Sequence, residues 1–342
     1  IVADMVILSI GVRPESGLAR DAGLEIGVTR GIKVRPTLQT SDPDIYAVGD
    51  VIEFPNPITG KPTITYLAGP ANKQGRIVAN NIVDGNTHAY GGAIQTAVAK
   101  VFDITVASTG VPEKLLDSEG LPHRAVITHS SAHAGYYPGA TVMTIKVVFH
   151  PEDGRLYGGQ IVGYEGVDKR IDLMASVVRR GGTIYDLTEL EHAYAPPYSS
   201  AKDPVNIAGF VAENVISGRS RQLQWHQVMG CDLDEMTLVD VRRPDEFALG
   251  TIEGAVNIPL AELRGRLDQI PRDKTTVVFC VVGQRAYHAE RILRGNGYDD
   301  VFNLSGGKMT FDNAAVHQGN EDIYSGKVIG KDDVIYTGGS SK

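Results

Sequence analysis

Of the two cysteines in the sequence, Cys280 has neighbours that could support chemistry. It follows the apolar run Thr275–Phe279, which predicts a strand, and it precedes a segment that predicts a helix over Gln284–Gly295. A junction of strand, loop and helix points backbone N–H groups into a small cup at the positive end of the helix. A cysteine at the base of that cup exists partly as thiolate. We therefore expect the cup to take an anionic sulfur species, such as a persulfide, thiosulfate or sulfide.

The expected loop after Cys280 is short, and its rim is basic. From Cys280 to Arg285 the spacing is C-x4-R. The residues between them, which form the expected persulfide loop, are Val281, Val282, Gly283 and Gln284. Because Arg285 adds positive charge at the rim, Cys280 and Arg285 are the first candidate catalytic residues.

Composition narrows the class of protein. The chain has 342 residues with 42% hydrophobic and 22% charged content, which is typical of a soluble protein of two or three domains. The net charge of -8 argues against nucleic acid as a partner, and no apolar run reaches the ~20 residues that span a bilayer. Cys231 is interpreted as structural or incidental, and two cysteines cannot build a disulfide framework. We expect a cytoplasmic protein with neither a nucleic-acid nor a membrane partner.

Periodicity and turn residues predict a multidomain chain with α/β and α+β parts. The last region alternates strands and helices, which favours a small α/β domain with a parallel sheet. The expected strands are Asp44–Asp50, Val142–Phe149, Leu156–Tyr164, Thr237–Val241 and Thr275–Phe279. The expected helices are Gly69–Val83, Asp168–Arg179, Asp203–Ile216 and Gln284–Gly295. Asp203 is the expected N-cap of the third helix, with Pro204 at its first position.

The chain begins with an apolar stretch. Residues Ile1–Ile10 are rich in Val, Ile and Leu and are bounded by Gly11 and Pro14, which predicts a buried strand. Because natural proteins rarely begin inside a buried strand, we expect the chain to be the C-terminal part of a longer protein.

Further motifs surround Cys280. They are Leu238–Arg242, Pro244–Phe247, Gly250–Pro259, Gly297–Tyr298 and Val301–Gly307. Together they closely resemble a single-domain rhodanese. Thr251 stands where that family usually has His, which we interpret as a change in a structural hydrogen bond. Related phosphatases use a loop one residue longer to admit a tetrahedral phosphate, so the resemblance implies sulfur transfer through a persulfide on Cys280.

A second resemblance lies near the N-terminus. The string Thr40–Asp50 closely resembles the second flavin motif of the pyridine nucleotide–disulfide oxidoreductases. At the end of its expected strand, Asp50 can accept a hydrogen bond from a ribityl hydroxyl, and Gly49 lets the backbone approach the pyrophosphate. The resemblance also implies that backbone N–H groups of Leu67 and Ala68, at a helix N-terminus, face the flavin pyrimidine edge.

These resemblances imply a domain order. Residues 1–90 are the end of a nicotinamide domain and the second part of an FAD-binding domain, with Gly11 close to the nicotinamide. Residues 91–217 are a dimerisation (interface) domain, 218–224 a linker, 225–330 a rhodanese domain and 331–342 a tail.

Two tyrosine motifs occur in the interface region, His133–Gly139 and His192–Asp203. They resemble the coenzyme A–disulfide reductase and NADH oxidase branch, in which one tyrosine from each motif reaches across the dimer toward the partner's active site. We assign this role to Tyr194 and to Tyr136, with Tyr137 as the alternative to Tyr136. A phenol can hydrogen-bond a thiolate or a sulfur leaving group.

The histidines that begin these motifs, His133 and His192, have neither an acidic partner in view nor a metal-ligand spacing. We interpret both as structural, and no metal site is expected.

The combination resembles a coenzyme A–disulfide reductase–rhodanese fusion. It implies FAD, NAD(P)H and coenzyme A as cofactors, a homodimer, and reduction of coenzyme A persulfide, polysulfide or coenzyme A disulfide. In that scheme hydride passes from NAD(P)H to FAD and electrons pass on to sulfur. The first flavin motif and the redox cysteine of the family are absent from this sequence. Two alternatives therefore stay open: a stand-alone rhodanese sulfurtransferase and a non-catalytic dimeric scaffold.

Overall fold

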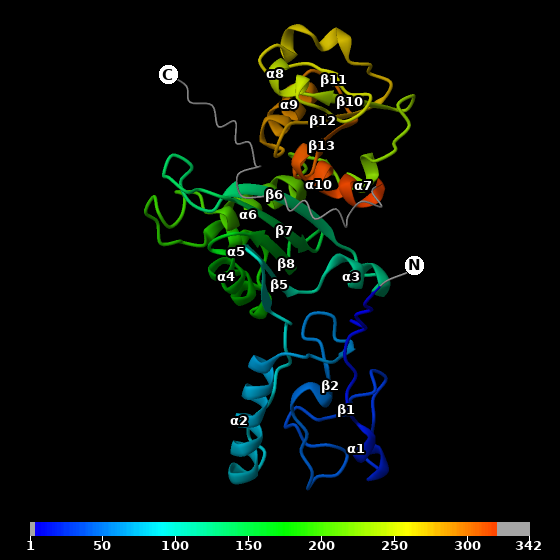
Figure 1. The fold of residues 1–342 in the computed structure, drawn as a ribbon, viewed down its shortest axis with the longest axis vertical. Helices are drawn as coiled ribbons and strands as arrows, with labels where there is room; N and C mark the ends of the chain where they lie inside the picture. The colour runs from blue at the N-terminus through cyan, green and yellow to red at the C-terminus, as the bar shows by residue number, and fades with distance from the viewer. Residues whose placement is uncertain (1–3, 320–342) are drawn as a thin grey trace. The chain divides into compact units, whose positions relative to one another are not determined.

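The computed structural model describes residues 4–319 of the chain. The chain divides into two compact units, Ile1–Gly218 and Arg219–Lys342 (Figure 1). The tail expected at 331–342 lies outside the described residues. Over the described part of the chain, no helix is long and apolar enough to cross a membrane.

The N-terminal unit begins with a small sheet and one long helix. Its first elements are α1 (Gly17–Asp21), β1 (Ile32–Lys33), η1 (Gly49–Val51), β2 (Ile52–Pro55), β3 (Pro62–Thr63) and α2 (Ala68–Asp84). Strand β2 lies between β1, to which it is parallel, and β3, to which it is antiparallel. Helix α2 ends where Gly85 adopts a φ of 78°, a left-handed conformation that favours glycine. The helix predicted over Gly69–Val83 is confirmed.

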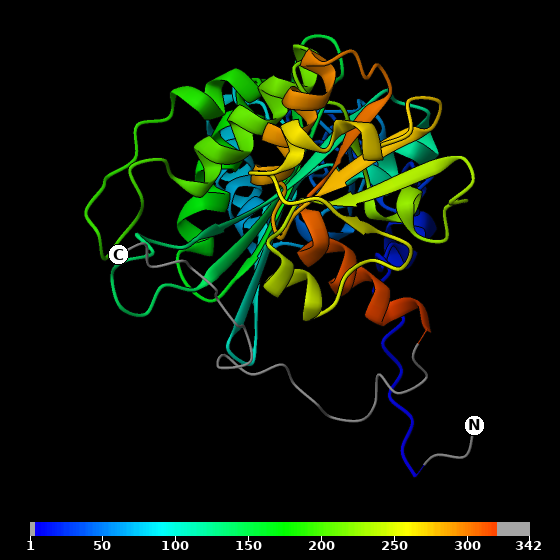
Figure 2. The ribbon, with the colours of Figure 1, turned by 90° about the horizontal axis from the view of Figure 1, so that it is seen from above.

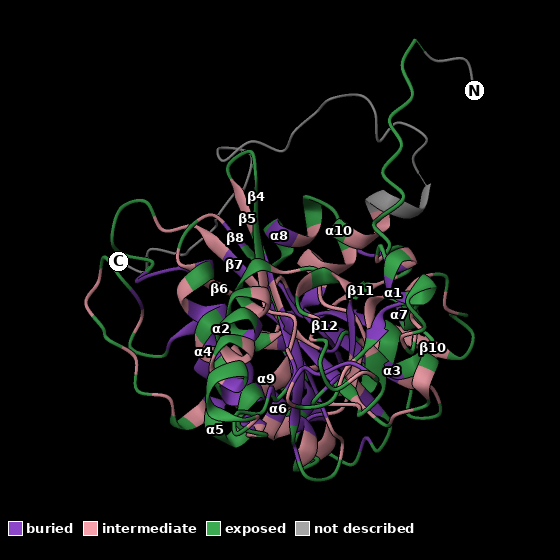
Figure 3. Cartoon of the chain, turned by 90° about the horizontal axis from the view of Figure 1, so that it is seen from below, coloured by how far each residue is buried: buried purple, intermediate pink, exposed green. Residues whose placement is uncertain are grey.

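The strand predicted at Ile1–Ile10 is wrong for the residues that the structure describes. Residues 4–10 have no strand partner there, and their side chains are exposed, from 76% at Met5 to 87% at Ile10 (Figure 3). An apolar run becomes a buried strand only where neighbouring strands and helices cover it. The described residues supply no such cover for this run.

The strand predicted at Asp44–Asp50 is also wrong. Only one isolated bridge, between Gln39 and Tyr46, forms in this stretch. Gly49 then turns the chain with a φ of 84° into the 3-10 helix η1, and the strand β2 follows at Ile52. Asp50 therefore lies in a helical turn that enters a strand, whereas its sequence context placed it at the end of one.

The second half of the N-terminal unit is an antiparallel sheet of five strands in the order β4-β5-β8-β7-β6. The strands are β4 (Ala97–Val101), β5 (Ile104–Gly110), β6 (Arg124–Ser131), β7 (Val142–Phe149) and β8 (Leu156–Gly163). The helices are α3 (Glu113–Glu119), α4 (Val167–Arg179), α5 (Ile184–Glu189) and α6 (Pro204–Ile216). The predicted strand pair and the predicted helices α4 and α6 are confirmed.

Helices α4 and α6 cover one face of this sheet (Figures 1 and 2). Alternate residues of β7, such as Ile145 and Val147, pack against Ile171 and Met174 of α4 in one apolar core. Complete burial of such a side chain contributes about 1.5–3 kcal/mol. Helix α6 begins as predicted, because the Asp203 carboxylate accepts a hydrogen bond from the backbone N–H of Val205.

The C-terminal unit is a parallel sheet of five strands in the order β11-β10-β12-β13-β9. The strands are β9 (Gln222–Leu223), β10 (Met236–Asp240), β11 (Val256–Asn257), β12 (Thr275–Phe279) and β13 (Val301–Leu304). The helices are α7 (Trp225–Val228), α8 (Pro244–Ala248), η2 (Leu263–Gly265), η3 (Leu267–Gln269), α9 (Gln284–Gly295) and α10 (Gly307–Gly319). The predicted α/β architecture is confirmed.

Two apolar cores lie on the two faces of this parallel sheet, and the buried residues concentrate there (Figure 3). Ala286 and Leu293 of α9 pack on one face, and Val228 of α7 packs on the other. One detail differs from expectation. The stretch predicted as a linker at 218–224 contains β9, which pairs with β13, so these residues are part of the sheet.

Candidate active site

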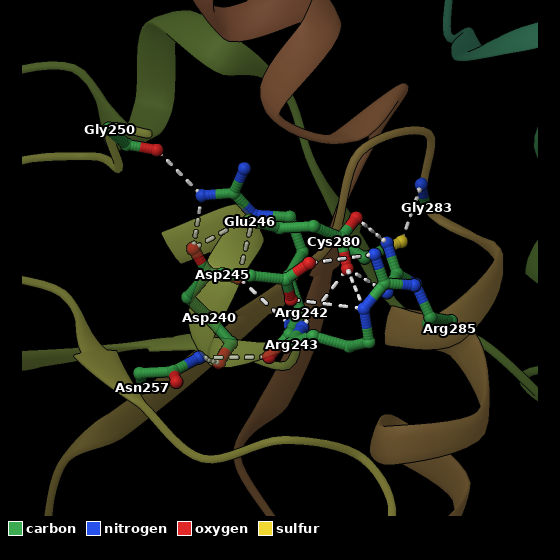
Figure 4. Close-up of polar contacts among 10 residues, drawn as sticks. All are labelled: Asp240, Arg242, Arg243, Asp245, Glu246, Gly250, Asn257, Cys280, Gly283 and Arg285. Atoms are coloured by element: carbon green, nitrogen blue, oxygen red, sulfur yellow. Dashed lines mark hydrogen bonds and ion pairs between the residues drawn. The ribbon is translucent and has the colours of Figure 1, made fainter. Parts of the chain in front are cut away.

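Cys280 lies at the base of the expected cup. Strand β12 ends at Phe279, and α9 begins at Gln284. Gly283 between them has a φ of 96° and directs its backbone N–H to the Cys280 sulfur at 3.2 Å (Figure 4). The Cys280 side chain is 1% exposed. The sulfur therefore sits at the positive end of α9 with a backbone donor aimed at it, as the strand–loop–helix pattern predicts.

The start of α10 holds the outer side of this loop. The backbone N–H groups of Lys308 and Met309 donate to the carbonyl oxygens of Cys280 and Val281 at 2.8 and 3.0 Å. A Cβ on Gly307 would stand only 2.6 Å from both of those oxygens. Position 307 therefore requires glycine. The carbonyl oxygens of Cys280 and Val281 accept their hydrogen bonds from α10, on the side of the loop away from the sulfur.

Asn303 fixes the remaining side of the loop. This residue of β13 is buried, and its side-chain amide donates to the carbonyl oxygen of Gly283 at 3.0 Å. Its own amide oxygen has no hydrogen-bond partner among the described residues. The Asn303 side chain thus donates to the residue whose N–H contacts the Cys280 sulfur.

Arg285 is held at the rim by Glu246 of α8. The two terminal nitrogens of Arg285 each donate to a different oxygen of the Glu246 carboxylate at 2.7 Å (Figure 4). The ion pair with Arg285 lowers the pKa of Glu246 below its ordinary value and outweighs the opposing effect of burial. The same pair raises the pKa of Arg285, to which the Cys280 thiol also contributes. The positive charge predicted at the rim is present, but it is paired.

Thr251 stands where the rhodanese family usually has His, and its side chain makes a structural hydrogen bond. Its hydroxyl donates to the Asp240 carboxylate at 2.8 Å, next to the buried ion pair between Asp240 and Arg242. The side-chain amide of Asn257 donates to the backbone carbonyl oxygens of Asp240 and Arg242 (Figure 4). This cluster fixes the end of β10 beside α8. It therefore supports Glu246 indirectly.

Cys231 takes no part in the cup. It is half-buried, and burial raises the pKa of its thiol. A thiol held in its neutral form is a poor nucleophile. This environment is consistent with the structural interpretation.

In the N-terminal unit, the hydroxyl oxygens of Tyr136 and Tyr194 lie 3.2 Å apart. The loops that carry them are joined by the backbone N–H of Ala134, which contacts the carbonyl oxygens of Pro196 and Ser199. Both phenols are exposed, at 78% for Tyr136 and 48% for Tyr194. The two tyrosines selected from separate motifs therefore form one pair at the surface, with Tyr136 and not Tyr137 in the contact.

Arg170 of α4 supports both tyrosine loops from below. Its guanidinium binds the Asp203 carboxylate, with contacts of 2.8 to 3.1 Å, and the carbonyl oxygen of Ala132 at 2.7 Å. The Ser199 hydroxyl donates to Asp203 at 2.6 Å. Burial would raise the pKa of Asp203, but the hydrogen bonds from Arg170, Ser199 and the Val205 N–H outweigh it and lower that pKa. The buried ion pair thus joins the segments that precede Tyr136 and follow Tyr194.

His192 has an acidic neighbour, Asp203, that sequence reasoning did not identify. Its Nδ1 lies 3.7 Å from a carboxylate oxygen of Asp203, and its side chain is 4% exposed. Neither ring nitrogen has a hydrogen-bond partner among the described residues. Burial lowers the pKa of His192, which Asp203 only partly opposes. His133 is buried with Nδ1 3.2 Å from the Ala134 carbonyl oxygen, so both histidines are packed among interior residues.

The residues predicted to bind flavin lie together around α2. The Gly49 N–H donates to the side chain of Gln74 in α2 at 2.6 Å, and Asp50 follows within η1. Nothing lies within 4 Å of the place where a Cβ on Gly49 would stand. Leu67 is the N-cap of α2 and Ala68 its first residue, and no side chain caps this helix within the described residues.

This arrangement fits the flavin assignment in part. Space beside Gly49 admits a close ligand, and the uncapped start of α2 offers backbone N–H groups to an electron-rich edge. Gly11 has a φ of 83° and open space around it, in the exposed segment that precedes α1. Over residues 4–319 no cluster of three or more potential metal ligands occurs.

Three family matches cover most of the chain. Residues 1–75 match the pyridine nucleotide-disulphide oxidoreductases, residues 96–204 match the dimerisation domain of that family, and residues 224–314 match the rhodanese-like domain. The chain therefore contains two segments that are similar to domains of the pyridine nucleotide-disulphide oxidoreductases. It carries a rhodanese-like domain after the dimerisation domain.

Several known proteins and solved structures are similar to this chain. The crystal structure of reduced Bacillus anthracis CoADR-RHD is 46% identical with a TM-score of 0.88, and the match covers 93% of this chain and 57% of that one. The NAD-dependent persulfide reductase from A. fulgidus is 41% identical with a TM-score of 0.81, covering 90% and 56%. The NAD(P)H sulfur oxidoreductase (CoA-dependent) of Pyrococcus abyssi is 37% identical over 203 residues, 59% of this chain and 45% of that protein. The chain spans about half the length of the curated relatives it matches.

Three residues of the chain make contacts that sequence reasoning did not assign. Glu246 and Asn303 lie inside the quoted rhodanese motifs, but their contacts cross between elements far apart in the chain. Arg170 could have been flagged as a charged residue on the apolar face of a predicted helix, where a buried partner is required.

Proposed function

We propose that this chain is part of an FAD-dependent reductase that uses NAD(P)H to reduce coenzyme A persulfide, polysulfide or coenzyme A disulfide, with sulfane sulfur carried on Cys280. The observation that carries the proposal is the Cys280 cup, with its Gly283 donor, in a chain whose other domains are those of a disulphide oxidoreductase. The similarity to a NAD-dependent persulfide reductase and to a CoA-dependent NAD(P)H sulfur oxidoreductase supports the same substrate class.

The residues around Gly49 would hold part of the cofactor. Gly49 would admit the pyrophosphate, Asp50 would accept a hydrogen bond from a ribityl hydroxyl, and the Leu67 and Ala68 N–H groups would bind the pyrimidine edge. Gly11 lies close to the nicotinamide in this proposal. FAD, when bound, supplies two-electron transfer from NAD(P)H to sulfur.

At Cys280 the chain's own chemistry is sulfur capture. The thiolate attacks the outer sulfur of a persulfide, and the Gly283 N–H stabilises negative charge on sulfur. Val281, Val282 and Gln284 complete the loop around the captured sulfur. Arg285 holds the rim through Glu246.

The protein is proposed to act as a cytoplasmic homodimer. Its sheet face opposite α4 and α6 leaves Val106 and Val162 exposed, at 39% and 40%, which favours contact with a second copy. In that dimer Tyr136 and Tyr194 would each reach toward the partner's active site and hydrogen-bond a sulfur leaving group.

Three measurements test the proposal. Purified protein should show a flavin absorbance band, and NAD(P)H should be oxidised with sulfide release when coenzyme A persulfide is added. Iodoacetamide trapping and mass spectrometry should find one added sulfur on Cys280, which Cys280→Ala removes. Sulfur on Cys280 with no flavin and no NAD(P)H oxidation would favour a stand-alone sulfurtransferase. Absence of all three signals would favour a non-catalytic scaffold.

A further inference from the structure

The cup has balanced charge. Three segments build it, residues 240–248, 280–285 and 305–312, and we call them the cup segments. Every Lys or Arg on the cup segments has a carboxylate partner on the same segments. The pairs are Arg242–Asp240 at 2.6 Å, Arg243–Asp245 at 3.0 Å, Arg285–Glu246 at 2.7 Å and Lys308–Asp312 at 2.6 Å.

The pair at the rim is the one that faces the sulfur. Both terminal nitrogens of Arg285 are used by the two oxygens of Glu246, and the Glu246 side chain is only 6% exposed. Arg285 lies in the first turn of α9, directly after the Cys280 loop, and the Cys280 thiol contributes to the raised pKa of Arg285. Because the two hydrogen bonds from Arg285 lower the pKa of Glu246 and outweigh its burial, the Glu246 charge persists at neutral pH and cancels that of Arg285.

The rest of the mouth is uncharged. Val281 and Val282 are half-buried apolar residues, and Gln284 is an exposed neutral amide. A dianion that enters such a mouth loses hydration and finds only backbone N–H groups in return. An alkyl persulfide brings at most one charge at its reacting end, together with carbon that the valines can contact.

We propose that Glu246 is a specificity-determining residue: by neutralising Arg285 it makes the cup select an alkyl persulfide over the thiosulfate dianion. The inference rests on the proposed sulfur transfer at Cys280 and deepens it. Specificity of this kind comes from weaker binding of the disfavoured ligand, which here is thiosulfate.

The transfer itself is balanced with either donor. The Cys280 thiolate attacks the outer sulfur of RS–SH, the S–S bond of the donor breaks, and RS⁻ leaves with the electron pair and takes up the persulfide proton. With thiosulfate the same attack releases sulfite. In both cases the Cys280 sulfur is oxidised to a persulfide, the leaving sulfur group is reduced, and no further oxidant is needed.

The experiment compares two donors on the full chain. Loading of Cys280 is timed by iodoacetamide trapping and mass spectrometry, with ethyl persulfide or thiosulfate as donor. We expect the wild-type protein to load from ethyl persulfide at least about tenfold faster at equal concentration. Glu246→Gln should raise thiosulfate loading about tenfold and so reduce the preference for ethyl persulfide over thiosulfate by a similar factor. Glu262→Gln, which releases Arg266 outside the cup segments of the same unit, is the matched control and should leave the donor ratio unchanged.

A second measurement uses the wild-type protein, so it does not depend on whether a variant folds. A paired rim makes wild-type thiosulfate loading nearly independent of ionic strength from about 0.05 to 0.5 M, whereas an unpaired cation would make it fall steeply. A steep fall, similar wild-type rates with both donors, or a donor ratio that Glu246→Gln leaves unchanged would each overturn the inference and leave the proposed function intact. No loading from either donor would overturn both.

Discussion

Tyr136 and Tyr194 are 58 residues apart in the sequence, yet their hydroxyl oxygens lie 3.2 Å apart. The hydrogen bond with Tyr194 raises the pKa of Tyr136. One phenol therefore donates to the other, and the pair acts as a unit. Arg170, the Asp203 carboxylate and the Ala134 N–H hold the loops that make this contact possible.

Loss of the Tyr194 hydroxyl should lower the pKa of Tyr136. Tyr194→Phe removes the hydrogen bond that raises it, and difference titration of phenolate absorbance measures the change. The matched control is Tyr198→Phe, because Tyr198 is exposed and lies in the same loop. If Tyr194→Phe and Tyr198→Phe give the same phenolate titration curve, the hydrogen bond between Tyr136 and Tyr194 does not exist in solution.

Loss of Arg170 should destabilise the N-terminal unit strongly. Arg170→Met leaves the buried Asp203 carboxylate without its cation, which costs about 3–5 kcal/mol. Arg170→Lys should recover only part of this, since one ammonium cannot bind Asp203 and the Ala132 carbonyl as the guanidinium does. Chemical denaturation measures the free energy of unfolding.

The control for this series is Arg180→Met. Arg180 is exposed at the end of the same helix, so its loss should change stability by less than about 0.5 kcal/mol. Equal effects of the substitutions at 170 and 180 would contradict the role assigned to Arg170.

His192 should make stability depend on pH. Burial lowers its pKa in the folded chain, so the unfolded chain binds the proton more tightly. Stability therefore falls as the pH drops below the ordinary histidine value of about 6.5, by at most about 1.4 kcal/mol per pH unit, until the folded pKa is passed. His192→Gln should flatten this slope, measured as the free energy of unfolding between about pH 7.5 and 5.5.

A control histidine separates this effect from general acid sensitivity. His88 is exposed, with 46% of its side chain accessible, and lies in the same unit. His88→Gln should keep the wild-type slope. A His192→Gln protein with the wild-type slope would show that the buried ring does not titrate as its surroundings require.

Asn303 should matter for sulfur loading. Asn303→Ala removes the donor to the Gly283 carbonyl, which costs about 1–3 kcal/mol of stability and frees the residue whose N–H contacts Cys280. We expect loading of Cys280 to slow about tenfold. Asn296→Ala is the control, because Asn296 is exposed and its side chain donates to the Ile292 carbonyl oxygen, away from Cys280. Loading of Asn303→Ala at the wild-type rate would remove Asn303 from the site.

Much of the local structure could be predicted from the chain. Helices α4, α6 and α9 and strands β7, β8 and β12 lie where periodicity and capping residues place them, with Asp203 as a true N-cap. The Cys280 cup was predicted for the same reason. Its parts, strand, loop and helix, are consecutive in sequence, so their geometry follows from local rules.

The errors have a different origin. Asp44–Asp50 was predicted as a strand from its composition, but Gly49 turns the chain into η1 before β2 begins. Residues 4–10 have strand-like composition and no strand partner among the described residues. Strand formation depends on pairing and cover, which composition does not encode.

Sequence reasoning alone therefore selected Cys280 as the candidate nucleophile, together with its loop and the two tyrosine motifs. Tertiary structure decided how they are charged and held: Glu246 cancels Arg285, Asn303 holds Gly283, and Arg170 joins the tyrosine loops. Each of these contacts joins segments distant in sequence. Hydrogen bonds and ion pairs act over about 3 Å, so only the packing of helices against sheets determines which of many polar residues meet.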